Sequence, residues 1–142
     1  MKKLLVVCVM LLTSAMCFAQ SEVFGVWLNE SGESQVEIKK EGSDYVGKVV
    51  WLKEPNNPDT NQPWLDNKNK DKSLQSRAVM GLPILHDFTY NAEEKEFEGG
   101  KIYDPRNGKN YTGKFWLNED GNLSVRGYIG FLFATETWTR VK

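Results

Sequence analysis

Residues 122–140 read NLSVRGYIGFLFATETWTR, and this stretch decides the fold. Apolar and polar side chains alternate along 123–129, and threonines alternate with larger residues along 132–141. The two runs meet at Gly130-Phe131, a short junction that contains glycine. Two-residue alternation on both sides of such a junction is typical of a β-hairpin. Because an isolated hairpin is only marginally stable in water, other strands must complete the sheet.

The residues before this hairpin supply those strands. Pro83 is expected at a strand start, an edge or a break, because proline cannot donate to a sheet ladder. Asn107-Gly108 suits a tight hairpin turn, since both residues tolerate positive φ. Both faces of 45–52 are apolar, so its inward face stays open. Further short strands are predicted at 24–28, 35–39, 45–52, 85–90, 97–104 and 111–117. This pattern predicts an all-β fold, a single antiparallel barrel of about eight to nine strands whose last strand returns to its first.

One long loop, residues 53–76, interrupts the strands. It is rich in Asn, Asp, Lys and Pro, and Trp64, Leu65 and Leu74 are its apolar residues. Loops of this length in compact domains are usually functional or disordered. Two readings stay open, an ordered flap over the barrel mouth anchored by Trp64-Leu65 and a solvated excursion.

The first 19 residues read as a secretory signal peptide. Lys2 and Lys3 precede an apolar run that is too short to span a membrane, and small residues lead to Ala19. We expect cleavage there, which leaves a β-barrel domain at 20–142 in the periplasm or outside the cell. Lipid attachment at Cys17 is not expected, because Met16 is a poor fit to the small residue that such processing requires.

Both cysteines, Cys8 and Cys17, lie inside this leader. The remaining chain can form neither a disulfide nor a cysteine metal site, so burial and the closed sheet must stabilise it. Loss of the leader's two lysines leaves 16 basic residues against 19 acidic ones, a net charge of about −3. We therefore expect no nucleic-acid partner and no membrane insertion after cleavage.

Two short motifs near the ends of the domain suggest how the barrel closes. Gly25 and Trp27 form a Gly-x-Trp motif, and Trp138 precedes Arg140 near the C-terminus. In lipocalins and related calycin barrels a Gly-x-Trp on the first strand meets a basic residue on the last. An indole ring attracts a guanidinium by about 0.5–2 kcal/mol. We therefore predict barrel closure through these four residues, with Trp27 stacked near Arg140.

Residues 25–140 as a whole resemble a bacterial family named domain of unknown function 2147 (DUF2147). The resemblance implies a lipocalin-like barrel and leaves activity open. A Gly-Arg pair usual in the family before the final Thr-x-Thr-Trp is not evident here, where Phe133-Ala134 stand. The matching segments are Gly25-Val26-Trp27, Gly47-Lys48-Val49-Val50-Trp51-Leu52, Asp66-Asn67-Lys68-Asn69 with Arg77 and Gly81-Leu82, Gly100-Lys101-Ile102-Tyr103-Asp104-Pro105, Arg126-Gly127-Tyr128-Ile129-Gly130 and Thr137-Trp138-Thr139-Arg140.

No catalytic or metal motif emerges from the sequence. His86 is the only histidine, Asp87 falls on the opposite face if the segment is extended, and no Gly-x-Ser-x-Gly elbow is present. The segment Asp66 to Asp71 lacks the glycine and terminal glutamate of an EF-hand. A looser site using Asp66, Asn69 and Asp71 stays possible, but side chains folded back on the loop backbone explain the pattern better. We expect no catalytic residue, no metal and no cofactor.

The favoured function is binding of a small, partly polar or amphipathic molecule inside the barrel. Arg126 and Glu136 are predicted to lie on neighbouring strands but on opposite faces, and an inward charge would be an ion pair or a ligand anchor. Two alternatives stay open: an envelope protein with a filled barrel acting through its loops, and a hydrolase using two carboxylates. Candidate ligand-binding residues are Trp51, Asp66, Asn69, Tyr103, Asp104, Arg126, Tyr128 and Glu136.

Overall fold

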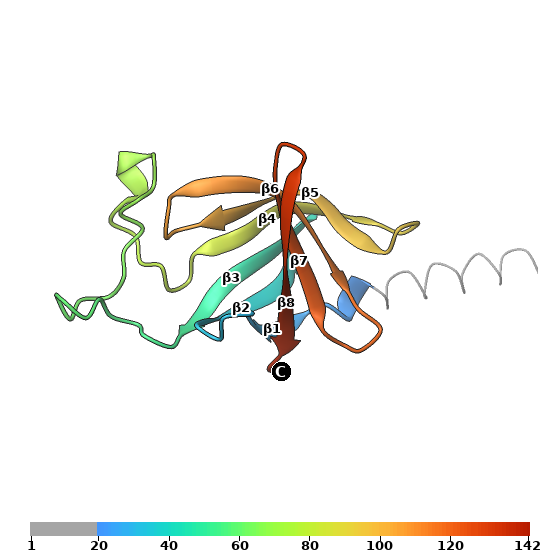
Figure 1. Ribbon diagram of the computed structural model, residues 1–142, viewed down its shortest axis with the longest axis horizontal. Coiled ribbons are helices and arrows are strands. Elements are labelled where there is room, and N and C mark those ends of the chain that lie inside the picture. Colours follow the sequence, from blue (N-terminus) through green and yellow to red (C-terminus); the bar gives the residue numbers. More distant parts are fainter. Residues whose placement is uncertain (1–19) are drawn as a thin grey trace, which may run out of the picture.

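The computed structural model describes residues 20–142 and shows a closed antiparallel barrel of eight strands in sequential order (Figure 1). The predicted leader and its cysteines lie outside the described residues. The strands are β1 (Gly25–Leu28), β2 (Ser34–Glu41), β3 (Asp44–Leu52), β4 (Pro83–Asn91), β5 (Glu96–Asp104), β6 (Lys109–Leu117), β7 (Leu123–Ile129) and β8 (Leu132–Arg140). The predicted fold class is thus confirmed, and no helix in residues 20–142 is long and apolar enough to cross a membrane.

The barrel closes where the sequence predicted. β1 pairs with β8 through Trp27 opposite Arg140 and Leu28 opposite Thr139. The Arg140 guanidinium lies over the Trp27 ring, 4.2 Å from its centroid. Gly25 is required beside this contact, because its φ is +131° and an added Cβ would collide with the Lys142 carbonyl.

β3 is kinked by a bulge that decides which residues face inward. Gln35 pairs with Trp51 while Val36 pairs with Val49, so Val50 is the extra residue of β3. Val49 faces the core, whereas Val50 and Trp51 are exposed. The inward face that the sequence left open is therefore the face of Val49.

The β5–β6 connection differs from the predicted tight turn. The N–H of Gly108 donates to the carbonyl of Asp104 at 2.8 Å, which closes a longer loop. Gly108 alone has positive φ, +72°, and Asn107 does not, so this is not a two-residue turn with both residues left-handed. Residues 105–108 form this loop, because Asp104 pairs with Lys109, and Arg106 lies within it.

The core fills only one half of the barrel. Large aromatic side chains pack at the end where β1 begins and β8 ends, and Phe97 stacks on Phe115 with their centroids 4.6 Å apart. Gly100 makes this packing possible, because a Cβ there would lie 2.5 Å from the Phe88 ring. Toward the other end aliphatic residues and glycines make up much of the inner wall, with Tyr103 and Trp138 beside them, and the interior opens.

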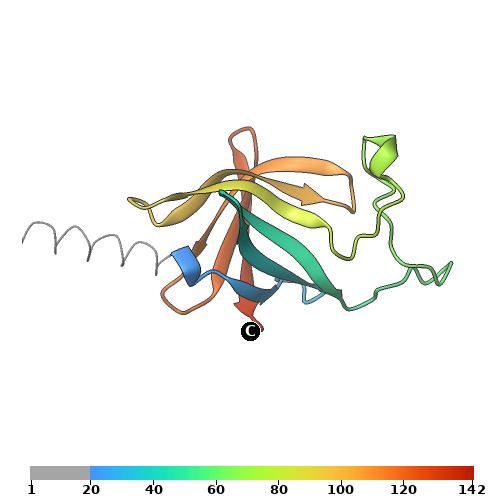
Figure 2. The same ribbon diagram turned by 180° about the vertical axis from the view of Figure 1, so that it is seen from behind.

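The long loop projects beyond that open end. It joins β3 to β4, contains a short 3-10 helix, η1 (Lys72–Leu74), and extends past the same end as the β5–β6 turn in both views (Figures 1 and 2). Isolated bridges join Asn56 to Pro63 and Leu65 to Ala78. The loop is therefore internally hydrogen-bonded, and β4 begins at Pro83 as the sequence allowed.

Candidate functional site

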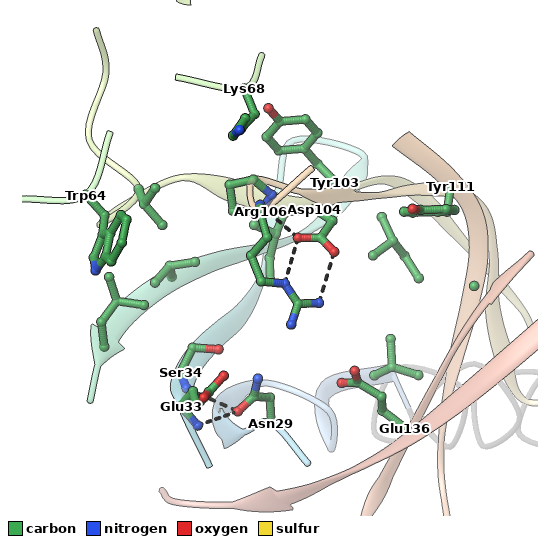
Figure 3. Close-up of a pocket in the computed structure, with 18 of the residues that line it drawn as sticks. Asn29, Glu33, Ser34, Trp64, Lys68, Tyr103, Asp104, Arg106, Tyr111 and Glu136 are labelled. Carbon is green, nitrogen blue, oxygen red and sulfur yellow. Dashed lines mark hydrogen bonds and ion pairs between the residues drawn. The ribbon is translucent and has the colours of Figure 1, made fainter. Parts of the chain in front are cut away.

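A cavity of about 960 Å³ occupies the open half of the barrel. Aliphatic side chains form its inner wall, polar side chains lie around its mouth, and the long loop contributes Trp64, Leu65 and Lys68 (Figure 3). The inner wall includes Val49, Leu52, Ile84, Ile102 and Val125. An apolar pocket with a few converging polar groups is the usual form of a small-molecule site.

Small residues explain why this half is hollow. Gly127 of β7 lies in the wall opposite Gly113 and Ala134 on the neighbouring strands. A Cβ on Gly127 would come no closer than 3.7 Å to another heavy atom, an ordinary van der Waals distance, so this position has room for a side-chain atom. The barrel strands carry four tryptophans, and only two of them are buried. Trp27 and Trp138 are buried, but Trp51 is 39% exposed and Trp116 lies beneath the guanidinium of Arg126 on the outer surface.

Asp104 and Arg106 form the polar centre of the mouth. Nε and Nη2 of Arg106 each donate to one carboxylate oxygen of Asp104 at 2.9 Å, a bidentate pair (Figure 3). Burial alone would raise the pKa of the Asp104 carboxyl, but its hydrogen bonds with Arg106 and the nearby positive charge hold that pKa below its ordinary value. Asp104 therefore stays ionised, which suits an anchor and not a general acid.

Two further carboxylates face the same space. Glu33 and Glu136 line the cavity together with Arg106. The hydrogen bonds that Arg106 donates to Asp104 raise the pKa of Arg106, and the charges of Glu136 and Glu33 raise it further. Glu136 is fixed by the indole N–H of Trp138, which donates to it at 2.8 Å. Glu33 is positioned by Asn29, whose side-chain oxygen accepts from the Glu33 backbone N–H at 3.0 Å.

Asp66 fastens the long loop to the barrel. Its side chain is completely buried and accepts from the Tyr103 hydroxyl at 2.5 Å, Asn69 Nδ2 at 2.9 Å and Arg77 Nε at 3.0 Å. Burial and the hydrogen bond to Asp66 raise the pKa of Tyr103 to about 12. Because Tyr103 belongs to β5 and Asp66 to the loop, this cluster holds the loop at the cavity mouth. The loop is thus ordered, but its anchor is Asp66 and not the predicted Trp64-Leu65, which line the cavity mouth and stay 37% and 43% exposed.

The residues that the sequence nominated for ligand binding separate into three groups. Tyr103, Asp104 and Glu136 line the cavity. Asp66 and Asn69 belong to the loop-fastening cluster behind it. Trp51, Arg126 and Tyr128 lie on the outer surface and do not line the cavity.

The prediction that Arg126 and Glu136 lie on opposite faces of the final hairpin is confirmed, and the structure decides which face is the inner one. Val125 pairs with Glu136 and Arg126 with Thr135, so Glu136 faces inward and Arg126 outward. One local expectation was wrong. Asp87 is not directed away from His86, because its φ of +63° interrupts the extended backbone and brings its carboxylate 2.9 Å from His86 Nδ1. The pair is exposed on β4 and lies outside the cavity.

Residues 20–142 contain no group of three or more side chains suited to holding a metal ion. The Asp66–Asp71 segment instead folds back on itself, as the sequence indicated: Asn69 accepts from the Asp71 N–H at 2.8 Å, and Asp71 accepts from the Ser73 N–H at 3.0 Å.

Sequence reasoning missed Arg106 and Glu33. The signal for Arg106 was present, since Asp104 and Arg106 flank a proline in a turn, a spacing that lets both side chains point the same way. Glu33 gave no signal, because a glutamate in a polar turn is usually solvated. Only the barrel shows that this turn lies at the cavity mouth.

Comparisons with known proteins agree with the geometry. Residues 25–140 match the family model described as "Uncharacterized protein conserved in bacteria (DUF2147)". A solved Helicobacter pylori protein, described as belonging to the lipocalin family, superposes with a TM-score of 0.70 and 22% identity over 84% of this chain and 83% of that one. The sequence matches none of the curated proteins with which it was compared.

Proposed function

The chain belongs to the DUF2147 family, and we propose that this member binds one small amphipathic molecule in the open half of its lipocalin-like barrel. The observation that supports the proposal is the uneven filling of the interior. Aromatic side chains occupy one half, while a cavity of about 960 Å³ occupies the other. Ligand pockets commonly measure about 300–1,000 Å³, so the space suits a single small molecule.

The distribution of side chains suggests how such a molecule would lie. Its apolar part would contact the aliphatic wall around Ile84, Ile102 and Val125. Its polar part would lie at the mouth beside the Asp104–Arg106 pair, where Glu136 offers a further acceptor. The fixed bidentate pair presents both a cation and an anion without a new ordering cost, which favours binding.

The loop would cover the bound molecule. Trp64 and Leu65 line the mouth, and the buried Asp66 cluster fixes the loop that carries them. Trp64 and Leu65 would shield the apolar part of the ligand from water. We propose that the protein carries or sequesters its ligand in the exported compartment that the leader predicts, without chemical change to it.

The test is a variant that fills the cavity and leaves the sheet intact. Gly127→Leu adds a side chain to a residue that lines the cavity and at which a Cβ fits, in ordinary contact with Tyr111 and Ile102. Thr139→Leu, on the exposed face of β8, adds similar bulk outside the cavity. Native mass spectrometry of gently purified protein should show a bound adduct for the wild type and for Thr139→Leu, and none for Gly127→Leu.

A fluorescent apolar probe, 1-anilinonaphthalene-8-sulfonate, provides the second readout. We expect at least about tenfold weaker probe binding by Gly127→Leu than by Thr139→Leu, since the inserted side chain takes the apolar contacts of the probe. Equal binding by a folded Gly127→Leu variant, together with no adduct on the wild type, would contradict the proposed function. The filled-barrel alternative would then be favoured.

A further inference from the structure

The tip of the β7–β8 hairpin is the most exposed apolar feature of residues 20–142. Phe131 at its apex is 92% exposed, followed by Ile129 at 65%, Leu132 at 63% and Phe133 at 59%. No other large apolar side chain in the described chain is more than half exposed. Soluble proteins rarely leave such side chains clustered unless they contact something.

The fold itself does not require these residues. Ile129 pairs with Leu132, so Gly130 and Phe131 form a two-residue turn, and Gly130 has a φ of +59°. This turn needs glycine at its first position but makes no demand for an aromatic residue at the second. Phe131 has no role in the packed core, and its place at the apex points to an external partner.

The charge behind the tip indicates the nature of that partner. The Arg126 guanidinium lies over the Phe133 ring, 4.2 Å from its centroid, and Lys101 is held by Thr112, which pairs with Tyr128. Neither cation makes a salt bridge among residues 20–142. Strands β6, β7 and β8 contain one acidic residue, Glu136, and it faces the cavity. The outer surface around the tip is therefore apolar at its apex and cationic just behind it.

From this arrangement we propose that the β7–β8 hairpin docks the protein on anionic lipid bilayers. At about 3.3 Å per residue, Phe133 and the guanidinium above it lie about 7 Å behind the apex. Interfacial apolar segments enter a membrane by about 5–10 Å, so Phe131 would reach the acyl boundary while Arg126 meets lipid phosphates. Tyr128 contacts Phe133 in a tilted arrangement, with the ring centroids 5.9 Å apart, and tyrosine is one of the residue types that favour this interface.

Docking would place the cavity mouth against the lipid surface. Ile129, Leu132 and Phe133 belong both to the exposed tip and to the rim of the cavity, and Lys68 of the long loop lies on the same rim. An amphipathic molecule could then pass between bilayer and cavity without crossing water. The proposed docking depends only on the hairpin, so it can be tested independently of the ligand proposed for the cavity.

Vesicle co-sedimentation tests the proposal with protein expressed from the full sequence. Wild type should bind vesicles of equimolar phosphatidylglycerol and phosphatidylcholine, bind phosphatidylcholine alone more weakly, and release from the anionic vesicles as salt rises. Phe131→Ser should weaken binding by roughly tenfold or more, because the buried ring is lost. Arg126→Gln should weaken binding to anionic vesicles by about fivefold.

The matched control is Val50→Ser. Val50 is 41% exposed and lies on β3, on the side of the closed barrel opposite β7, so its loss should leave vesicle binding unchanged. Phe131→Ser and Val50→Ser should both retain the wild-type thermal transition. All proteins share the same N-terminus, so a difference between them reports the hairpin.

Absence of wild-type binding at low salt would overturn the proposal, as would equal binding by Phe131→Ser and wild type. Sedimentation velocity supplies the remaining outcome. A concentration-dependent dimer that Phe131→Ser abolishes, without vesicle binding by the wild type, would show that a second copy covers the hairpin instead.

Discussion

The guanidinium of Arg140 lies over the indole ring of Trp27, with its carbon atom 4.2 Å from the ring centroid. The same guanidinium donates to the carbonyl of Phe24 at 3.0 Å and to the carbonyl of Glu22. The side chain thus joins the last strand to the segment that precedes the first. It acts where the barrel would otherwise open, because β1 and β8 share only a short ladder.

We predict that Arg140→Ala destabilises the fold by about 1–2 kcal/mol, since a cation–π contact and two charge-assisted hydrogen bonds are lost. Arg140→Lys should recover part of this, because a lysine keeps the charge over the ring but not the planar fork. Urea denaturation with a common m-value measures both. Equal free energies of unfolding for Arg140→Ala and wild type would show that this contact does not stabilise the closed barrel.

A second prediction concerns the fastening of the long loop. Asp66→Asn replaces a buried acceptor of three hydrogen bonds with a group that also donates. If the loop and the barrel unfold together, this change should lower the free energy of unfolding by about 3 kcal/mol. If only the loop is released, trypsin should cleave rapidly at Lys68, Lys70 or Lys72 while the barrel stays folded. Asp71→Asn, whose partners are local and exposed, is the control and should resist trypsin as wild type does.

The third prediction is a loss of stability at alkaline pH. Burial and the bond to Asp66 raise the pKa of Tyr103 to about 12 in the folded chain, against about 10 in the unfolded chain. The neutral phenol is therefore favoured by folding, and its contribution is complete below pH 10 and is lost as pH rises toward 12. The difference in unfolding free energy between wild type and Tyr103→Phe should narrow over this interval. A difference independent of pH would show that Tyr103 ionises alike in both states.

The fourth prediction compares two glycines. Gly100→Ala places a methyl group 2.5 Å from the Phe88 ring and should cost about 1–3 kcal/mol through overpacking. Gly127→Ala meets only Tyr111 at 3.7 Å and Ile102 at 3.8 Å, so its stability should change by less than about 0.5 kcal/mol. Thermal unfolding of the two variants tests whether the barrel is packed at Gly100 and hollow at Gly127.

The fifth prediction is that Arg106 contributes more to binding at the cavity mouth than to the stability of the barrel. The Arg106 side chain is 75% exposed but its partner Asp104 only 18%, so Arg106→Gln should lower the unfolding free energy by only about 1–2 kcal/mol. Binding of the anionic probe 1-anilinonaphthalene-8-sulfonate should nevertheless weaken by several-fold, because the cation at the mouth is gone. Lys95→Gln, at the opposite end of the barrel, is the control.

Most features of the barrel could be predicted from the amino-acid sequence. Strand periodicity located all eight strands to within about two residues, and the hairpin pattern correctly placed Val125 and Glu136 on one face. Periodicity failed where one residue departs from extended geometry. The Val50 bulge and the left-handed Asp87 each reverse the alternation. Valine gives no signal of a bulge, and aspartate tolerates positive φ but seldom adopts it within a strand.

The site could be read only in part. Tyr103, Asp104 and Glu136 could be predicted, because polar groups in apolar strands are costly to bury unless they have a partner or a ligand. All three line the cavity. The same argument nominated Arg126 and Tyr128, which serve the outer surface, because alternation predicts two faces without naming the inner one. Asp66 stood out for its loop motif, yet its burial depends on Tyr103 and Arg77 from distant parts of the chain.

The sequence by itself determined an antiparallel β-barrel, because strand alternation and turn glycines are local signals. The meeting of Trp27 with Arg140 followed from the resemblance of the two terminal motifs to those of lipocalin-like barrels. Only the tertiary structure decided that half of this barrel is hollow and that Glu33, Arg106 and Glu136 converge at its mouth. These features depend on how side chains from non-adjacent strands share volume. The volume inside a barrel is a property of the closed sheet and not of any one strand.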